Sequence, residues 1–122
     1  MKKEYRVKKS KEIEEILKRK RFSSNSYFII YVKEQNETSH FRYAMSVSKK
    51  IGDAVIRNRL KRQIRAIMRN FTIKNGYDLF IIARNPIKSI SFLQMSDQLE
   101  FLLQKQKLLV KGENNDTIFK TK

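Results

Sequence analysis

Basic side chains gather in one stretch of this sequence at a spacing that suits the binding of phosphate groups. The segment from Arg42 to Arg69 holds nine basic residues and one acidic residue, Asp53. If residues 53–70 form a helix, a rotation of about 100° per residue places its apolar side chains within an arc of about 80°. That arc contains Ile56, Leu60, Ile64, Ile67 and Phe71.

The cations of this segment fall mainly on the opposite side of the predicted helix, where no carboxylate offsets them. That side carries Lys61, Arg62, Arg65 and Arg69 with Asn58, and it is flanked by Arg57 and Arg59. A face that only meets water normally mixes signs, because Glu–Lys pairs four residues apart stabilise a helix and like charges repel. Five of its six cations are arginines, whose guanidinium forks bind phosphate oxygens with two hydrogen bonds. We therefore predict a surface for a polyanion. The alternatives are a solvated face and a membrane-surface helix, whose apolar side would have to be free for lipid.

The composition of the whole chain supports a polyanionic partner. The 122 residues include 28 Lys and Arg against 12 Asp and Glu, a net charge of +16, which repels itself unless a partner neutralises it. The sequence has no cysteine, which excludes disulfides and thiolate metal sites. No apolar run approaches the roughly 20 residues that span a bilayer, and the N-terminus lacks the apolar segment of a signal peptide. We expect a cytoplasmic protein without a membrane partner.

The elements that must position the basic helix follow from periodicity and turn residues. Asp53 is the predicted N-cap of this helix after a turn at Gly52, and Ser10 that of the first helix. The apolar run of residues 79–83 predicts a central strand covered on both faces. The pattern predicts helices over 10–20, over 53–70 and from Ser91 or Ser96 onward, and strands over 27–32, 41–48 and 77–84. This mixed order indicates one α+β domain or small α/β sandwich over residues 1–109, with a disordered polar tail over 110–122.

The context of the helix favours RNA over DNA. Helix-turn-helix proteins pair two helices across a short turn, whereas this helix is predicted between two strands. The open face of the sheet is predicted to carry Tyr27, Tyr31 and Arg42, which suits unstacked bases of a single strand. The charge alone does not separate the two nucleic acids.

The sequence shows no constellation for protein-based catalysis. A protein nuclease needs a general acid–base pair or carboxylates gathered around a metal ion. The single histidine, His40, is predicted in a loop, and Asp53 and Asp78 stand apart from other acids. The acidic residues of 12–15 fall on a charged helix face. We predict no catalytic residue, no metal ligand and no cofactor in this chain. A self-sufficient nuclease built from acids that converge in space remains an alternative.

The run from Ser46 to Arg65 resembles the signature of the bacterial ribonuclease P protein component. It reads SVSKKIGDAVIRNRLKRQIR, and it matches every fixed position of the pattern S-V-S-K-K, a short turn, then R-N-R-x-K-R-x-x-R. The order of elements also fits over residues 4–108, including Ile82-Ala83-Arg84 at the end of the third strand. The resemblance implies a single-domain α-β sandwich of order αβββαβα with a central sheet. It also implies a left-handed βαβ crossover around the basic helix, against the general rule for parallel strands.

In that family the catalyst is an RNA subunit, which removes the 5′ leader of precursor tRNA with RNA-bound magnesium. The resemblance therefore implies that this chain is the protein subunit of an endoribonuclease holoenzyme. Its expected partners are the catalytic RNA and precursor tRNA, with neither DNA nor membrane among them. The alternative is a general or ribosome-associated RNA-binding protein that has no enzyme partner.

The resemblance also implies two contact surfaces. The surface for the catalytic RNA would consist of Ser48, Lys49, Lys50, Arg57, Asn58, Arg59, Lys61, Arg62 and Arg65, to which the helical pattern adds Arg69. A cleft between the first helix and the sheet would hold the leader. In the family this cleft has two aromatic residues on the helix and one on the strand. Here Tyr31 fits the strand position, whereas Ile13 and Leu17 occupy the helix positions, for which core packing is the alternative. We also assign Arg42 and Ser46 to this cleft.

Overall fold

The computed structural model describes residues 5–7 and 9–110, so most of the predicted tail of 110–122 lies outside the described residues. The elements in chain order are α1 (Ser10–Lys18), β1 (Phe22–Ser24), β2 (Phe28–Glu34), β3 (Arg42–Ser46), α2 (Ala54–Arg69), β4 (Tyr77–Ala83), the 3-10 helix η2 (Asn85–Ser89) and α3 (Phe92–Lys105). Apart from η2, this is the order αβββαβα implied by the resemblance. Our own pattern reading missed β1 and η2.

The four strands form one mixed sheet in the order β1-β2-β4-β3. β2 is antiparallel to both β1 and β4, whereas β3 and β4 are parallel. The central position predicted for residues 79–83 is confirmed, because β4 lies between β2 and β3. Leu79 and Ile81 have no exposed surface.

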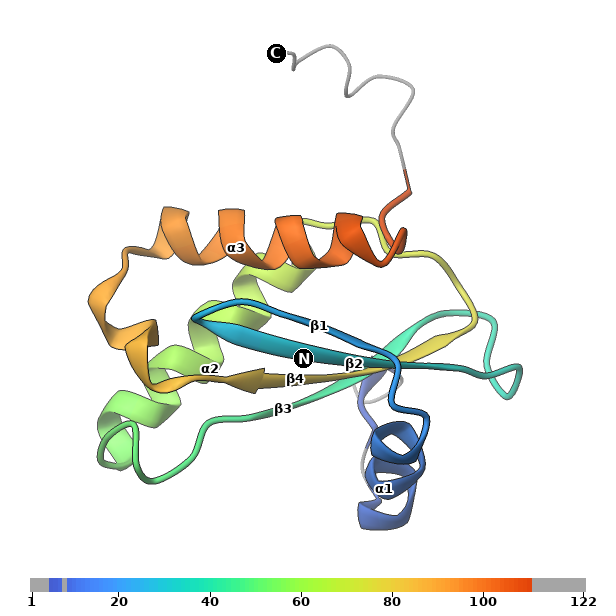
Figure 1. Cartoon of the computed structure of the whole chain (residues 1–122), viewed down its shortest axis with the longest axis horizontal. Helices are drawn as coiled ribbons and strands as arrows, with labels where there is room; N and C mark the ends of the chain where they lie inside the picture. Colours follow the sequence, from blue (N-terminus) through green and yellow to red (C-terminus); the bar gives the residue numbers. More distant parts are fainter. Residues whose placement is uncertain (1–4, 8, 111–122) are drawn as a thin grey trace, which may run out of the picture.

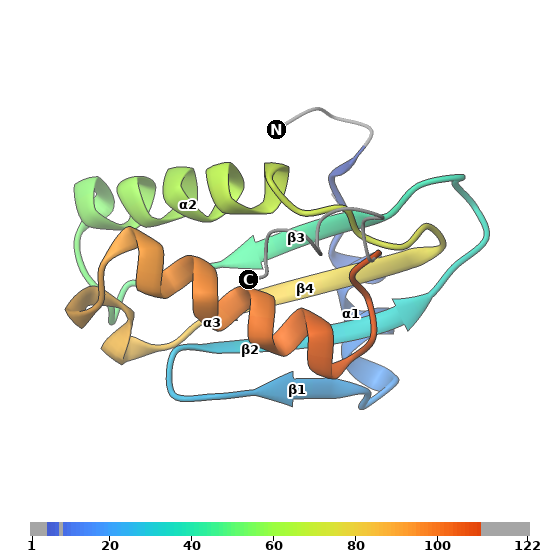
Figure 2. The same ribbon diagram turned by 90° about the horizontal axis from the view of Figure 1, so that it is seen from above.

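The crossover from β3 through α2 to β4 is left-handed. Figure 2 views the sheet from the side of α2 and α3, and both strands run from right to left in that view. With these strands turned to point upward, the chain passes from β3 on the right, through the helix in front, to β4 on the left. Parallel crossovers turn the other way in nearly all proteins. The handedness expected from the resemblance is therefore confirmed.

The helices divide unequally between the two faces of the sheet. Figure 1 shows α2 and α3 on one side and α1 on the other. The larger core lies under α2 and α3, where Phe28, Ile30 and Val32 of β2 meet Leu60 and other side chains of the two helices. A smaller core of Val7, Ile16 and Ala44 lies under α1. Because α1 is short, it leaves part of its face of the sheet uncovered.

Caps fix the starts of the longer helices. Asp53 Oδ1 accepts from the Ile56 N–H at 3.0 Å, which confirms the predicted N-cap of α2. Ser91 caps α3 by accepting from the Gln94 N–H at 3.1 Å. The predicted N-cap Ser10 is wrong, because α1 already includes this residue. Lys9 occupies the cap position, where its N–H donates to Glu12 Oε1 at 3.4 Å.

Candidate nucleic-acid interface

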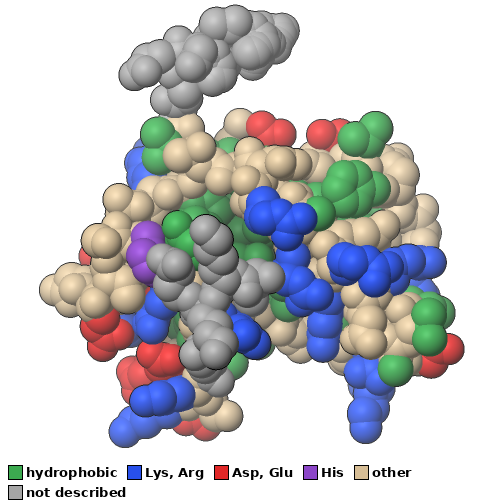
Figure 3. Space-filling view, turned by 180° about the vertical axis from the view of Figure 1, so that it is seen from behind, with side chains coloured by type: hydrophobic (Ala, Val, Ile, Leu, Met, Phe, Trp, Pro, Cys, Tyr) green, Lys and Arg blue, Asp and Glu red, His purple; other side chains and the backbone are tan. Residues whose placement is uncertain are grey.

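The apolar arc of α2 faces the sheet, as its periodicity predicted. Leu60, Ile64, Ile67 and Met68 are buried. The polar side of α2 therefore faces outward, with Asn58, Arg59, Arg62 and Arg69 exposed and Arg57, Lys61 and Arg65 partly exposed. Figure 3 shows this face of the molecule, where Lys and Arg side chains spread over the region of α2 and acidic side chains lie toward the margins.

The cations of α2 have no acidic partner among the residues that the structure describes. Within the described part of the chain, none of them forms an ion pair with a carboxylate. Arg57 Nε donates to the Gly52 carbonyl oxygen at 3.1 Å, which directs this side chain toward the preceding loop. Burial raises the pKa of Tyr43, although Arg65 and Arg69 act to lower it. The phenol thus stays neutral at ordinary pH and adds no negative charge beneath these arginines.

The loop between β3 and α2 extends the basic surface. Ser48, Lys49 and Lys50 are exposed, while the neighbouring Ile51 is buried and anchors the loop in the larger core. A Cβ atom at Gly52 would lie 3.0 Å from the side chain of Ile56, so glycine permits the close approach of this loop to the first turn of α2. The loop thus places Lys49 and Lys50 directly before the first turn of the basic helix.

On the opposite face of the sheet, the register brings aromatic side chains together. Tyr31 of β2 lies opposite Phe22 of β1 and Phe80 of β4. The rings of Phe22 and Tyr31 are 5.2 Å apart at an angle of 35°. Phe22 is 52% exposed, which leaves its ring accessible to a ligand. The structure thus places an aromatic pair at the edge of the predicted cleft.

The other residues predicted for the cleft differ in their surroundings. Ile13 of α1 packs against the smaller core with Tyr31 and Phe80, whereas Leu17 is 36% exposed. Ser46 is partly exposed and lies opposite Ile82 on this face. Tyr27, predicted on the open face, instead precedes β2 and packs against the larger core on the other side. The prediction for Tyr27 is wrong because the strand begins one residue later.

Arg42 also lies on this face, but its charge is already paired. Its Nε and Nη2 donate to the two carboxylate oxygens of Asp78 at 2.9 and 2.7 Å. Glu12 of α1 lies 3.2 Å from Nη1, and Glu37 lies 3.4 Å from Nη2. The hydrogen bond with Asp78 raises the pKa of Arg42 more than burial lowers it. Arg42 therefore joins α1 to the sheet and has no free charge to offer a ligand.

The acidic residues and the histidine of the described chain do not form a metal centre. Nowhere in residues 5–7 and 9–110 do three His, Asp or Glu side chains gather in a way that could hold a metal ion. His40 packs on Tyr5 with ring centroids 4.6 Å apart, and its Nδ1 lies 2.8 Å from the Phe41 carbonyl oxygen. In the same residues, no helix has the length and apolar character of a membrane span.

Comparison with known proteins decides the family. The Ribonuclease P family model matches residues 1–107. The ribonuclease P protein component of Oceanobacillus iheyensis is 38% identical over 120 residues, which cover 97% of this chain and 99% of that protein. The corresponding protein of Geobacillus kaustophilus is 40% identical over 114 residues, covering 92% of this chain and 94% of that protein. The chain belongs to the ribonuclease P protein family.

Solved structures of ribonuclease P proteins share this fold. The Staphylococcus aureus RNase P protein superposes with a TM-score of 0.78 at 36% identity, covering 87% of this chain and 98% of that chain. The RNase P protein from Thermotoga maritima gives a TM-score of 0.73 at 26% identity, covering 88% and 98%. The predicted α+β fold is thereby confirmed. As a ribonuclease P protein, this chain is a subunit of an endoribonuclease that also contains an RNA subunit.

The ribonuclease P protein contains two site features that sequence reasoning missed. Phe22 had no predicted place because β1 has only three residues. Phe80 was treated as one residue of a strand that is apolar on both faces, with no assignment to the cleft. The cross-strand position of Phe22 beside Tyr31 offers aromatic surface where Ile13 and Leu17 offer none.

Proposed function

We propose that this protein binds the catalytic RNA of ribonuclease P through α2 and the Ser48–Lys50 loop, and holds the 5′ leader of precursor tRNA against the other face of the sheet. The observation that carries the first half is the absence of carboxylate partners for the cations of α2 in the described chain. Six unpaired cations along one helix are costly unless phosphates approach them. RNA rather than DNA is the proposed partner.

The second half of the proposal rests on the uncovered aromatic surface beside α1. Phe22 and Tyr31 present adjacent rings on the sheet, and every base has a face that stacks on such rings whatever its identity. A single strand fits this surface better than a duplex, because bases inside a duplex are already stacked on each other. The 5′ leader is a single-stranded part of precursor tRNA.

In this arrangement the protein assists a reaction that the RNA subunit catalyses. Its cations reduce the repulsion between the phosphates of the catalytic RNA and those of the substrate, a role that metal ions otherwise share. We propose that magnesium belongs to the RNA subunit and that this chain contributes no cofactor and no catalytic side chain.

The test is cleavage of precursor tRNA by a bacterial ribonuclease P RNA at low magnesium, with and without the protein. We expect the protein to restore cleavage at magnesium concentrations where the RNA alone is nearly inactive, because its cations replace part of the ionic screening. An unchanged rate and substrate affinity would rule the proposal out. Equal affinity for precursor and leaderless tRNA would instead favour a general RNA-binding protein. Cleavage by RNA-free protein would establish a self-sufficient nuclease.

The substitution Phe22→Ala tests the proposed leader surface, which is the face of the sheet on the side of α1 from Ser46 on β3 to Phe22 on β1. Since stacking of a base on an aromatic side chain contributes about 1–3 kcal/mol, we expect the affinity of the holoenzyme for precursor tRNA to fall by about tenfold. Binding of leaderless tRNA should not change. The matched control is Phe101→Ala on α3, which removes a ring of similar exposure, 56%, from the opposite side of the sheet. A similar loss in both variants would contradict the assignment.

A further inference from the structure

A second group of cations lies outside α2, at the end of α1. Lys18, Arg19, Lys20 and Arg21 are four consecutive basic residues that lead from α1 directly into β1. Lys33 of β2 comes close to this segment, because Arg19, Arg21 and Lys33 line the same hollow. The family signature lies elsewhere in the chain and assigns no role to these residues.

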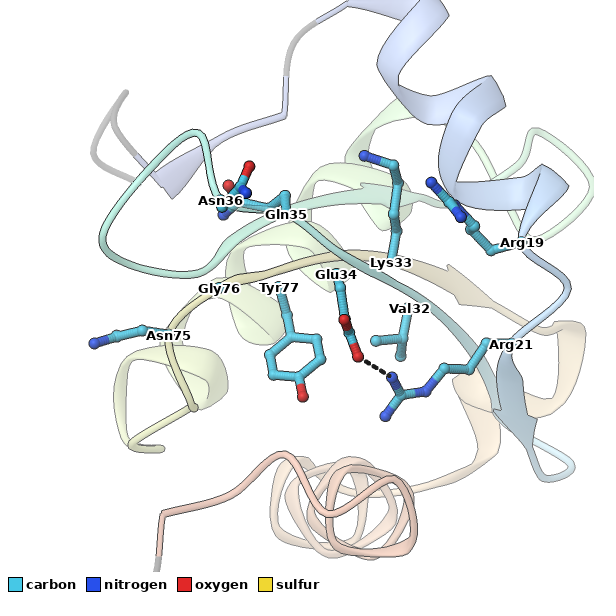
Figure 4. Close-up of a pocket in the computed structure, with 10 residues that line it drawn as sticks. All are labelled: Arg19, Arg21, Val32, Lys33, Glu34, Gln35, Asn36, Asn75, Gly76 and Tyr77. Carbon is cyan, nitrogen blue, oxygen red and sulfur yellow. Dashed lines mark ion pairs between the residues drawn. The ribbon is translucent and has the colours of Figure 1, made fainter.

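The hollow has a volume of about 700 Å³ and a mostly polar lining. Figure 4 shows it beside the start of β1, with Arg19 and Lys33 on the α1 side of β2 and with Arg21, Glu34 and Tyr77 toward α3. Asn36 and Asn75 also line it, from two loops. Polar and cationic residues around an open hollow suit phosphate and ribose oxygens better than an apolar ligand.

Arg21 differs from the other cations of this group in how many contacts hold its side chain. Arg21 is held in place: its Nε donates to Gln106 Oε1 at 3.2 Å, its guanidinium lies 5.5 Å from the centre of the Tyr77 ring, and Nη1 lies 3.9 Å from Glu34. Lys18 has one exposed partner, Glu15, at 3.7 Å. In the described chain, Arg19, Lys20 and Lys33 have no ion pair. The positive charge of the group is thus largely available.

The position of this group relative to the leader surface indicates which part of the substrate it can reach. The leader surface crosses the sheet from Ser46 on β3 to Phe22 on β1, which is three strand spacings of about 4.8 Å, or about 14 Å. At about 3.4 Å per stacked nucleotide, that length accommodates no more than about four nucleotides. Phe22 directly follows Arg21, and Lys33 lies two residues beyond Tyr31 on the same face of β2. A longer leader that passes the edge of β1 therefore reaches these cations.

We infer that Lys18–Arg21 and Lys33 form a second RNA-binding surface, which binds phosphates of the 5′ leader beyond the aromatic pair. This inference rests on the proposed function. It adds that leader length, beyond about four nucleotides, contributes to substrate affinity through the protein. Arg21 serves mainly to fix the segment, and Arg19, Lys20 and Lys33 make the contacts.

The test compares two double variants in the holoenzyme reconstituted with a bacterial ribonuclease P RNA. Arg19→Gln with Lys20→Gly removes two cations from the proposed surface. Lys20 has a φ of 55°, so glycine suits its backbone and the fold is not endangered. The control, Lys74→Gln with Lys105→Gln, removes two exposed cations that no carboxylate pairs in the described chain. Affinity is measured for precursor tRNAs with leaders of about three and about ten nucleotides and for leaderless tRNA, across a salt series.

For the long leader, we expect the test variant to bind about three- to tenfold more weakly than wild type, given the modest strength of exposed ionic contacts. Its salt slope should be less steep by about 1.4. Short-leader affinity and the control variant should match wild type. Equal losses on both leaders, or none on either, would overturn the inference while leaving the proposed function intact. If wild type itself ignored the leader, the proposed function would fail and this inference with it.

Discussion

Replacing Arg59 and Arg62 together by alanine should lower the affinity of the protein for ribonuclease P RNA by about 100-fold. Both side chains are exposed on α2, and neither has a carboxylate partner in the described chain. A hydrogen bond to a charged group contributes at least about 1.5 kcal/mol, and about 1.4 kcal/mol corresponds to a factor of ten. If about five phosphates are neutralised by the wild type, log K should fall against log salt with a slope of about −3 to −5. The double variant should have a slope smaller by about 1.5.

The same variant should be as stable as the wild type. Exposed substitutions of this kind change the free energy of unfolding by about 0.5 kcal/mol or less. Alanine also has the highest helix propensity, and its introduction relieves repulsion between like charges. Urea unfolding measures this. Lys74→Ala with Lys105→Ala, which also removes two exposed cations, is the charge-matched control for RNA binding. A large loss of stability in the double variant would mean that these arginines serve the fold, and RNA affinity equal to that of the control would mean that α2 is not the interface.

The basic helix could be predicted because its signals are local. The burial of Leu60 and Ile64 follows from the spacing of apolar residues, and the cap at Asp53 needs only the first turn of the helix. The scarcity of acidic residues in the segment itself leaves these arginines without a local partner. The caps and the apolar spacing do not depend on the distant parts of the chain.

β1 and the aromatic pair could not be predicted in this way, because β1 depends on contacts far along the sequence. Ser23 Oγ donates to the Leu102 carbonyl oxygen at 3.3 Å, and Arg21 binds Gln106. The turn after β1 is fixed by Asn25, whose Oδ1 accepts from the N–H groups of Tyr27 and Phe28 at 2.9 Å. β1 has three residues and one large apolar side chain, so it is too short to show the alternation from which a strand is predicted.

The pairing of Arg42 with carboxylates could not be predicted for a related reason. Within its strand, Arg42 is a cation on a small polar face, which suggests a free charge for the leader. Its principal partner, Asp78, is 36 residues away and comes beside it only through the parallel pairing of β3 with β4. Glu12 reaches it from α1 on the same face. The handedness of the crossover likewise has no local signal, and it was expected only from the family resemblance.

Removal of Asp78 should therefore be the most destabilising of the changes considered. Its side chain is 3% exposed and that of Arg42 is 13% exposed, so Asp78→Ala leaves a buried guanidinium without its main partner. Breaking such a pair costs about 3–5 kcal/mol. Because the contacts with Glu12 and Glu37 remain, we expect a loss of about 3 kcal/mol. The melting temperature should fall by about 10 °C, measured by thermal and urea unfolding.

Two further variants separate the buried pair from charge effects in general. Glu37→Ala removes a carboxylate that is 68% exposed and lies 3.4 Å from the same guanidinium, so its loss should cost less than about 1 kcal/mol. Arg42→Met combined with Asp78→Leu removes both charges of the buried pair. It should be more stable than Asp78→Ala, because no buried guanidinium is left without its main partner. If Asp78→Ala unfolded no more easily than Glu37→Ala, the pair of Arg42 with Asp78 would not be what stabilises this face of the sheet. The leader cleft would then depend on the small apolar core under α1 and on the contact of Arg42 with Glu12.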